Sequence, residues 1–286
     1  QNKIRAGLLR EDLFTVVHEQ VLTDTARYAD VLLPATTFLE HAELRRSYGA
    51  MLAQYCQPVI EPVGEARSNH WLFGELCRRM DLTRPGEPET PDDLVQAIIA
   101  TSHSSAELAR SFAATGRAVP PCGRRPVPFV DVFPGTADRR IDLFPSSLDQ
   151  ASTYGLYTYL PIRESEKFPL SLISPSTSKA ISSTLYQLVQ GTVPLEMHPA
   201  DARVRGIADG DVVRMFNDSG EVRCAAKISS DVRPGVVVMP KGLWARHTHN
   251  GQTTNALVPD TLSDVGGGAC FNDSRVQIER TNGSLS

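Results

Sequence analysis

Long apolar runs are missing from this sequence, and so is an excess of basic residues. No stretch of 18 apolar residues occurs among the 286 residues, so the sequence predicts no membrane-spanning helix. The 29 Lys and Arg residues stand against 33 Asp and Glu residues, for a formal net charge of −4. This balance provides no long-range attraction for nucleic acid or for an anionic membrane. We therefore expect neither as a partner.

Paired cysteine motifs are absent as well. The five cysteines are widely spaced, and no two of them form a Cys-x-x-Cys pair; they are Cys56, Cys77, Cys122, Cys224 and Cys270. The sequence therefore predicts neither a zinc site nor an iron–sulfur cluster within these residues. Free, mostly buried thiols in a reducing compartment are the simplest account of such spacing.

The first residues carry no targeting signal. Gln1–Arg5 lacks the apolar core and the small-residue cleavage site of a signal peptide, and it does not begin with Met. We expect that the sequence starts within a longer polypeptide, which leaves a signal further upstream open. With that reservation, the expected location is the cytoplasm.

The stretch Leu195–Pro240 predicts a compact, β-rich domain. Two apolar runs, Val212–Phe216 and Val222–Ile228, have the turn residues Asn-Asp-Ser-Gly between them, which is typical of a hairpin. A further strand is expected at Val236–Met239. Proline at a first helical position predicts a short helix within His198–Arg205.

Residues 13–41 have the rhythm of a parallel α/β unit. A strand candidate, Leu13–Val17, leads through a polar loop and a brief helix at Thr25–Tyr28 to a second strand at Ala29–Pro34. Ligands bind beyond the carboxyl ends of the strands in open α/β sheets. The polar loop Glu19–Thr25 lies at such an end and is therefore a candidate binding loop.

The middle of the chain predicts helices and then a linker. Ser68 is a good cap for an amphipathic helix at Asn69–Met80. Helical spacing also predicts a helix at Asp92–Thr101 and another that ends near Ala113. The segment Arg117–Pro128 is rich in proline and arginine and has no periodicity, which is typical of a linker.

A hydroxyl-rich loop follows a predicted core strand at Phe168–Ile173. Seven of the eleven residues in Ser174–Thr184 are Ser or Thr. Hydroxyls and backbone N–H groups can donate to a phosphate, and a lysine adds a point charge. The candidates are Ser174, Ser176, Thr177, Ser178 and Lys179, with Ser182 and Ser183 beside them. A solvated polar loop is the alternative, since such loops are common on protein surfaces.

Taken together, these features resemble the carboxy-terminal portion of the molybdopterin oxidoreductases, the dimethyl sulfoxide reductase family. The resemblance rests on the order of His198–Ala202, Gly206–Asp211 and Arg233–Gly235, and on the segment His18–His41. It implies an α/β segment followed by a mainly β domain, with a six-stranded double-psi β-barrel at the C-terminus.

The resemblance divides the chain into four parts. Residues 1–116 would form a partial α/β cofactor-binding region with helices, and residues 117–166 a linker and connector. Residues 167–280 would form the double-psi barrel that binds a molybdopterin dinucleotide, and residues 281–286 a tail. Within the connector, Arg139–Pro145 is similar to a short strand that precedes the barrel in this family.

The resemblance also implies a set of residues that contact molybdopterin guanine dinucleotide. They are Gln20, Thr23, Thr25, Ser174, Ser176, Thr177, Ser178, Lys179, His249, Thr254, Asn255, Phe271 and Asn272. For Thr23 the alternative is a simple helix cap.

Neither a metal site nor a catalytic residue can be named. His247 and His249 are two residues apart, but a metal site would need a third ligand. Glu40 and His41 form a pair of the kind used in proton transfer, yet they lack partners. A solvated helix start is the simpler interpretation of that pair.

The implied function is the carboxy-terminal part of a molybdenum or tungsten oxidoreductase. It would bind bis-molybdopterin guanine dinucleotide for two-electron chemistry on a small substrate. The metal ligand and a 4Fe–4S cluster would lie in an amino-terminal remainder, and an electron-transfer subunit is a further expected partner. The alternatives are a non-redox barrel that serves as a binding module and a separately encoded dinucleotide-binding subunit. Residues 13–41 favour the oxidoreductase, because a lone barrel would not need them.

Overall fold

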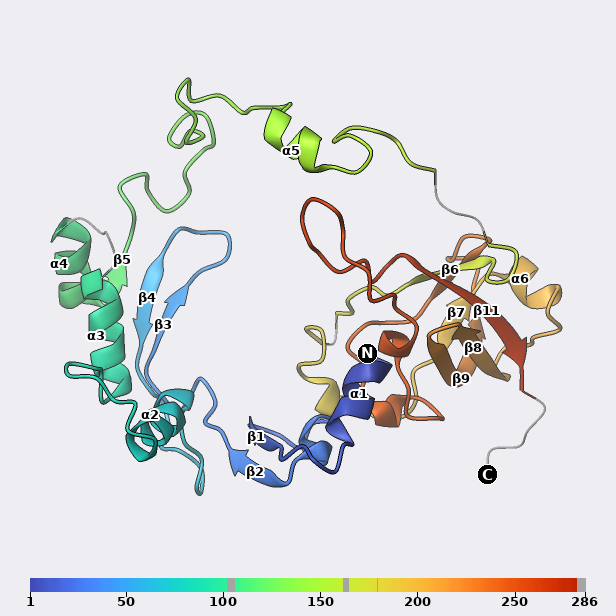
Figure 1. Ribbon diagram of the computed structural model, residues 1–286, viewed down its shortest axis with the longest axis horizontal. Coiled ribbons are helices and arrows are strands. Elements are labelled where there is room, and N and C mark those ends of the chain that lie inside the picture. Colours follow the sequence, from blue (N-terminus) through green and yellow to red (C-terminus); the bar gives the residue numbers. More distant parts are fainter. Residues whose placement is uncertain (102–105, 162–164, 179, 282–286) are drawn as a thin grey trace. The chain divides into compact units, whose positions relative to one another are not determined.

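Two compact units make up the chain (Figure 1). The computed structural model describes residues 1–101, 106–161, 165–178 and 180–281. The barrel unit comprises Gln1–Phe14, Thr23–Tyr28 and Phe144–Ser286, and the sheet unit comprises Thr15–Leu22 and Ala29–Leu143. Among the described residues, no helix is both long and apolar enough to cross a membrane.

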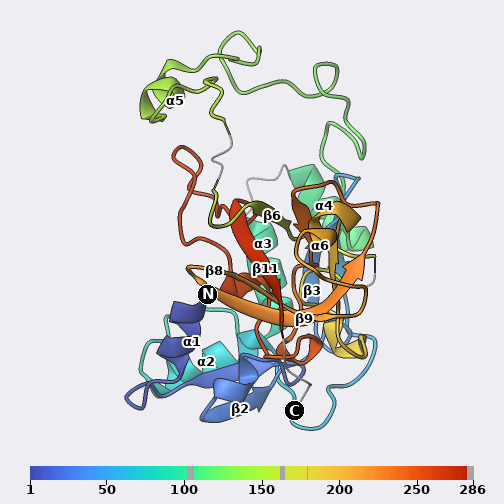
Figure 2. The ribbon, with the colours of Figure 1, turned by 90° about the vertical axis from the view of Figure 1, so that its right-hand side faces the viewer.

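Six strands of the barrel unit close into a barrel in the order β10-β6-β11-β8-β9-β7. The strands are β6 (Leu170–Ile173), β7 (Leu195–Met197), β8 (Val212–Asn217), β9 (Gly220–Ile228), β10 (Val236–Val238) and β11 (Ser274–Arg280). Strand β6 pairs parallel with β10 and β7 pairs parallel with β9, whereas the other neighbours are antiparallel. Figure 2 shows β8 and β9 beside β11. This confirms the predicted six-stranded double-psi β-barrel.

The hairpin of β8 and β9 forms because apolar residues alternate on both strands. Val213 and Met215 point inward from β8, opposite Cys224 and Val222 of β9. The hairpin turn is tighter than the sequence indicates, because Asn217 pairs with the glycine that begins β9. The side-chain oxygen of Asn217 also accepts a hydrogen bond from the backbone N–H of Ser219 at 2.9 Å, which fixes the turn.

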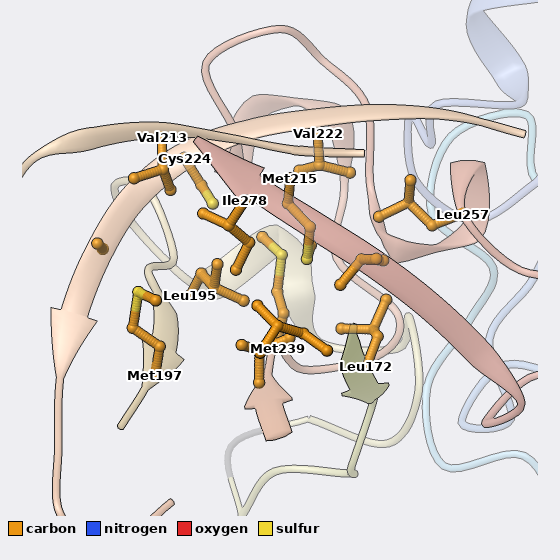
Figure 3. Packing of buried hydrophobic residues seen from close by; sticks show 14 of the residues in the cluster. Leu172, Leu195, Met197, Val213, Met215, Val222, Cys224, Met239, Leu257 and Ile278 are labelled. Carbon is orange, nitrogen blue, oxygen red and sulfur yellow. The ribbon is translucent and has the colours of Figure 1, made fainter. Parts of the chain in front are cut away.

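Side chains from all six strands fill the interior of the barrel (Figure 3). The buried core includes Leu172, Leu195, Met197, Val213, Met215, Val222, Cys224, Met239, Leu257 and Ile278. Methionines suit such an interior because they adapt to irregular gaps. Burial raises the pKa of the Cys224 thiol to about 12, so this cysteine is a core residue and not a nucleophile.

The barrel unit also contains short helices, some before its strands and some between them. They are α1 (Asn2–Leu8), η1 (Ala26–Tyr28), α5 (Ser146–Ala151), η2 (Tyr186–Leu188), α6 (Pro199–Arg203), η3 (Ala245–His247) and η4 (Thr254–Ala256). The predicted helix start at Pro199 is confirmed, and the Nδ1 atom of His198 caps it by accepting from the N–H of Ala200 at 3.0 Å.

The strand expected at Arg139–Pro145 is wrong. No strand occurs there, and helix α5 begins directly afterwards, which the sequence did not indicate. Arg139 has a positive φ of 58°, a left-handed backbone conformation that interrupts an extended strand.

The sheet unit contains a parallel strand pair and a separate antiparallel sheet. Its strands are β1 (Val16–Glu19), β2 (Val31–Pro34), β3 (Glu43–Arg46), β4 (Ala53–Cys56) and β5 (Arg117–Ala118), and its helices are α2 (Asn69–Arg79), α3 (Pro91–Thr101) and α4 (Ala106–Thr115). The parallel pairing of β1 with β2 confirms the predicted α/β arrangement. The predicted cap of α2 is also confirmed, since Ser68 Oγ accepts from the N–H of Trp71 at 3.1 Å.

Glu40 has a structural position that the sequence did not reveal. It is buried, and no helix begins there, so the expected solvated helix start is wrong. Its carboxylate accepts hydrogen bonds from the backbone N–H of Thr37 at 2.6 Å and from that of Val63 at 2.7 Å. These two donors lower the pKa of Glu40 below its ordinary value of 4.5. Glu40 therefore links the loop at Thr37 to the loop at Val63 through hydrogen bonds.

We expect Glu40 to stabilise the protein above its unfolded-state pKa and to lose this effect as the pH falls through its lower folded-state pKa. The Glu40→Gln variant should have a lower urea midpoint than the wild type at pH 7. The difference between the two midpoints should shrink at acid pH, below 4.5. Urea titrations across this pH range provide the measurement, and a difference independent of pH would contradict the assignment.

The barrel core predicts a contrast between two leucines of the same unit. Leu195 is 0% exposed and Leu188 is 70% exposed. Replacing Leu195 by Ala should lower the free energy of unfolding by about 2–5 kcal/mol through lost burial and a residual cavity. The Leu188→Ala change should cost less than about 1 kcal/mol. Chemical denaturation measures both, and equal costs would contradict the described core.

Candidate functional site

A pocket of about 860 Å³ opens in the barrel unit. Its walls come from the start of α1, the loops that follow β6 and β10, the turn between β8 and β9, and the segment that begins with η4 and leads to β11. We call it the barrel pocket. Most of these wall segments are connections between strands, where binding residues concentrate in proteins with a rigid scaffold.

Parallel pairing explains why two of these loops meet. Strands β6 and β10 run side by side with Leu172 opposite Val237, so their carboxyl ends lie at the same edge of the barrel. Beyond the strands, the N–H of Lys241 donates to the carbonyl of Pro175 at 3.1 Å. The β6 loop (residues 174–184) and the β10 loop (residues 239–248) therefore leave the barrel together, and they bring Ser174 and Lys241 to one pocket.

Close contact between the two loops requires a glycine. Gly242 has a φ of +79°, and a Cβ atom there would lie 2.2 Å from the backbone carbonyl atoms of Ser182. Only glycine fits this conformation and this spacing. Sequence reasoning missed Lys241 and Gly242, although a signal was present: like Ser174, they directly follow a core strand.

The Ser174 side chain is the clearest sign of a binding function in the pocket. Ser174 is 6% exposed and lines the barrel pocket. Its backbone N–H donates to Oδ1 of Asn272 at 3.4 Å, but its Oγ has no hydrogen-bond partner within the part of the chain that the structure describes. A buried hydroxyl without a partner destabilises a protein. A ligand in the pocket would give this hydroxyl its missing partner.

The charges around the barrel pocket leave one lysine without a carboxylate. Asp260 pairs with Lys3, which lowers the pKa of Asp260, and Asp218 pairs with Lys167. Lys241, in contrast, has no carboxylate oxygen within 4.0 Å among residues 1–101, 106–161, 165–178 and 180–281. Its Nζ lies 6.0 Å from the centre of the Phe271 ring. A cation beside an aromatic face suits a ligand that has both negative charge and a planar ring.

Several of the predicted binding residues line the barrel pocket. They are Ser174, Thr254, Asn255 and Phe271, together with Ser182 and Ser183. Thr254 is buried in η4, and Phe271 is partly exposed just before β11. The structure thus brings together residues that are nearly a hundred positions apart in the sequence.

Other predicted residues lie outside the lining of the pocket. Ser176 and Ser178 are exposed, and Thr177 forms a bridge with Ala180. His249 is exposed and donates its backbone N–H to the carbonyl of Arg223 at 2.8 Å. Asn272 does not line the pocket, but its Oδ1 accepts from the backbone N–H of Ser174. Lys179 lies outside the described residues. Their binding roles stay predictions.

The amino-terminal candidates have local partners. Thr23 Oγ1 accepts from the N–H of Ala26 at 3.2 Å, which is the cap that was its alternative role. The carbonyl of Thr25 accepts from the N–H of Tyr28 at 3.1 Å. Gln20 belongs to the sheet unit, where its Nε2 donates to the carbonyl of Thr36 at 2.9 Å. None of the three candidates lines the barrel pocket.

Comparison with known proteins identifies the family. Residues 175–275 match the model of the Molydopterin dinucleotide binding domain, and residues 1–79 match the model of Molybdopterin oxidoreductase. The chain belongs to the molybdopterin oxidoreductase family. Most residues that line the barrel pocket lie within the matched residues 175–275, and the match supports a molybdopterin cofactor.

Similar members of the molybdopterin oxidoreductase family are considerably longer. The chain is 37% identical over 98% of its length to the "Probable oxidoreductase YoaE" of Bacillus subtilis, and covers 42% of that protein. It is 26% identical over 87% of its length to the trimethylamine-N-oxide reductase of Haemophilus influenzae, and covers 35% of it. The chain therefore spans less than half the length of these relatives.

The fold also occurs in a solved structure. The acetylene hydratase of Pelobacter acetylenicus superposes with a TM-score of 0.75 at 18% identity, over 98% of this chain and 42% of that one. At this identity the likeness shows a shared fold.

A molybdopterin dinucleotide fits the residues of the barrel pocket. Such a ligand combines phosphate charge with hydrogen-bonding rings. The unpartnered hydroxyl of Ser174, the lysine without a carboxylate and the glycine that permits close approach of two loops match these needs.

We expect that the hydroxyl of Ser174 does not stabilise the cofactor-free protein. The free energy of unfolding of the Ser174→Ala variant should equal that of the wild type or exceed it by up to about 1 kcal/mol. The reason is that the buried hydroxyl loses no hydrogen bond within the described residues. As a control, Thr248→Val removes a buried hydroxyl that donates to the carbonyl of Gln252 at 2.7 Å. That change should cost about 1 kcal/mol or more. Denaturation of the cofactor-free protein measures both, and a comparable loss at Ser174 would contradict the unpartnered hydroxyl.

Proposed function

We propose that this chain holds a molybdopterin guanine dinucleotide within a molybdenum or tungsten oxidoreductase that performs two-electron chemistry on a small substrate. The observation that supports this proposal most is the barrel pocket itself. Within the described residues, it combines the unpartnered hydroxyl of Ser174 with the uncompensated charge of Lys241. Lys241 lies inside the matched dinucleotide-binding domain, and Ser174 immediately precedes it.

Each wall of the pocket has a role in this proposal. Lys241 would neutralise phosphate charge, and the hydroxyls of Ser174 and Thr254 would bond to polar atoms of the ligand. The amide of Asn255 would add a donor and an acceptor. Phe271 would offer a flat apolar surface to the guanine ring. Few cations are needed, because neutral donors carry most of the binding.

The remaining predicted contacts belong to the same proposal. Gln20, Thr23 and Thr25 would contact a pterin dinucleotide from the amino-terminal part of the chain, and Ser176, Thr177, Ser178, Lys179, His249 and Asn272 from the barrel unit. When bound, the cofactor supplies the redox chemistry, while the chain binds and orients it.

The proposal extends to the location and the partners of the chain. The metal ligand and a 4Fe–4S cluster would come from an amino-terminal remainder, and electrons would pass to or from a further subunit. All five cysteines are free, which agrees with a reducing compartment such as the cytoplasm. Only Cys224 is buried, so the expectation of mostly buried thiols is wrong. The alternatives of a lone binding barrel or a separate dinucleotide-binding subunit are weaker, because residues 1–79 match the oxidoreductase model and β1 pairs with β2 outside the barrel.

Cofactor retention tests the proposal. The protein is purified from a host that makes molybdopterin guanine dinucleotide, and the acid-released guanine nucleotide and the molybdenum or tungsten are measured. The Lys241→Ala variant should retain about tenfold less nucleotide than the wild type, since a charge-assisted contact is lost. Lys227→Ala is the matched control, because Lys227 pairs with Glu196 outside the pocket.

Two outcomes would contradict the proposal. A wild-type protein without guanine nucleotide would refute the cofactor, and full retention by Lys241→Ala would refute the pocket. The exposed Ser176→Ala variant adds a test of the loop assignment. If Ser176→Ala loses nucleotide and Lys241→Ala does not, the contacts lie in the outer part of the β6 loop instead of the barrel pocket.

A further inference from the structure

A buried histidine lies behind the barrel pocket and does not line it. His247 closes η3 and is 0% exposed. Its Nδ1 accepts from the backbone N–H of Trp244 at 3.0 Å, and its Nε2 lies 3.2 Å from the carbonyl oxygen of Val189. The ring of Tyr186 packs against it with 5.3 Å between the ring centres. The imidazole thus joins the β10 loop to the residues that follow the β6 loop.

The two contacts of the imidazole define one tautomer. A carbonyl can only accept, so Nε2 carries the hydrogen that Val189 receives. A backbone N–H can only donate, so Nδ1 carries none. A side chain here must therefore present an acceptor toward Trp244 and a donor toward Val189, which the neutral imidazole does.

Further contacts join the β10 loop to residues 182–189, and we call this set of contacts, with those of His247, the junction. Trp244 Nε1 donates to the carbonyl of Ser183 at 3.0 Å, and Arg246 donates to the carbonyl of Gln187 at 2.6 Å. At the other end, Gly242 touches the backbone of Ser182. The junction therefore fixes the β10 loop against residues 182–189. It carries pocket-lining residues on both sides: Lys241 and Gly242 on one, Ser182 and Ser183 on the other.

We propose that His247 is a positioning residue for the barrel pocket. Its Nδ1 fixes the backbone of Trp244, the indole of Trp244 holds Ser183, and the two loops thereby keep the spacing that ligand binding requires. This inference rests on the proposed function for the identity of the ligand. The spacing of the pocket-lining loops would then depend on Nδ1 of His247, an acceptor atom that does not itself line the pocket.

Two amide substitutions separate the two ring nitrogens. In His247→Asn, the side-chain oxygen can take the place of Nδ1 and accept from Trp244, but the side chain is too short to reach Val189. In His247→Gln, the amide nitrogen can take the place of Nε2 and donate to Val189, while no acceptor faces Trp244. Each variant keeps one hydrogen bond and loses the other, so the pair separates the role of Nδ1 from that of Nε2.

The positioning role predicts unequal effects on the retained cofactor. In protein from a host that makes the dinucleotide, His247→Asn should retain guanine nucleotide near the wild-type level. His247→Gln should retain about tenfold less, as expected for the loss of one buried hydrogen bond. Equal retention by the two variants, or lower retention by the Asn variant, would overturn the inference.

Tryptophan fluorescence provides a readout that needs no cofactor. The chain has two tryptophans, so Trp71→Phe leaves Trp244 as the reporter. In folded monomer isolated by gel filtration, His247→Gln should shift the emission to longer wavelengths, and His247→Asn should not. The absence of this difference, or the failure of both variants to yield folded protein, would overturn the inference. A wild type without nucleotide would instead refute the proposed function, and the fluorescence would still test the junction.

Discussion

The barrel pocket depends on the parallel pairing of β6 with β10. Antiparallel neighbours would send their following loops to opposite ends of the barrel, whereas parallel neighbours send them to the same end. Here this brings Ser174 and Lys241 to the lining of one pocket. The backbone bond from Lys241 to Pro175 continues the pairing beyond the strands. The apolar core that packs these strands together therefore also fixes the positions of the two loops that line the pocket.

The polar groups of the pocket lower the stability of the cofactor-free protein. Within the described residues, the hydroxyl of Ser174 is buried without a partner, and Lys241 lines the pocket with no carboxylate oxygen within 4.0 Å. Either group would be better satisfied with a polar, anionic ligand present. Gly242 permits the contact of the two loops, and the buried bond from Trp244 to His247 holds the loop that carries Lys241. The fold thus prepares the site before binding.

Local patterns were enough to predict much of the fold. The alternation in β8 and β9, with Asn-Asp-Ser-Gly between them, is encoded by adjacent residues, and so is the start of α6 at Pro199. Lys241 and Gly242 escaped notice because their importance comes from a strand pairing between distant segments. The sequence predicts a solvated position for Glu40, because its donors, including the backbone of Val63, meet it only in the folded chain. The resemblance to a family supplied Asn255, which no local pattern would have selected.

We propose that the pocket between the β6 and β10 loops binds a guanine dinucleotide. An experimental density map of the protein, purified from a host that makes the molybdopterin cofactor, tests this binding site. We expect ligand density in contact with Ser174 and Lys241, with a planar ring against Phe271. A fully loaded protein with this pocket empty, and its dinucleotide held elsewhere, would contradict it.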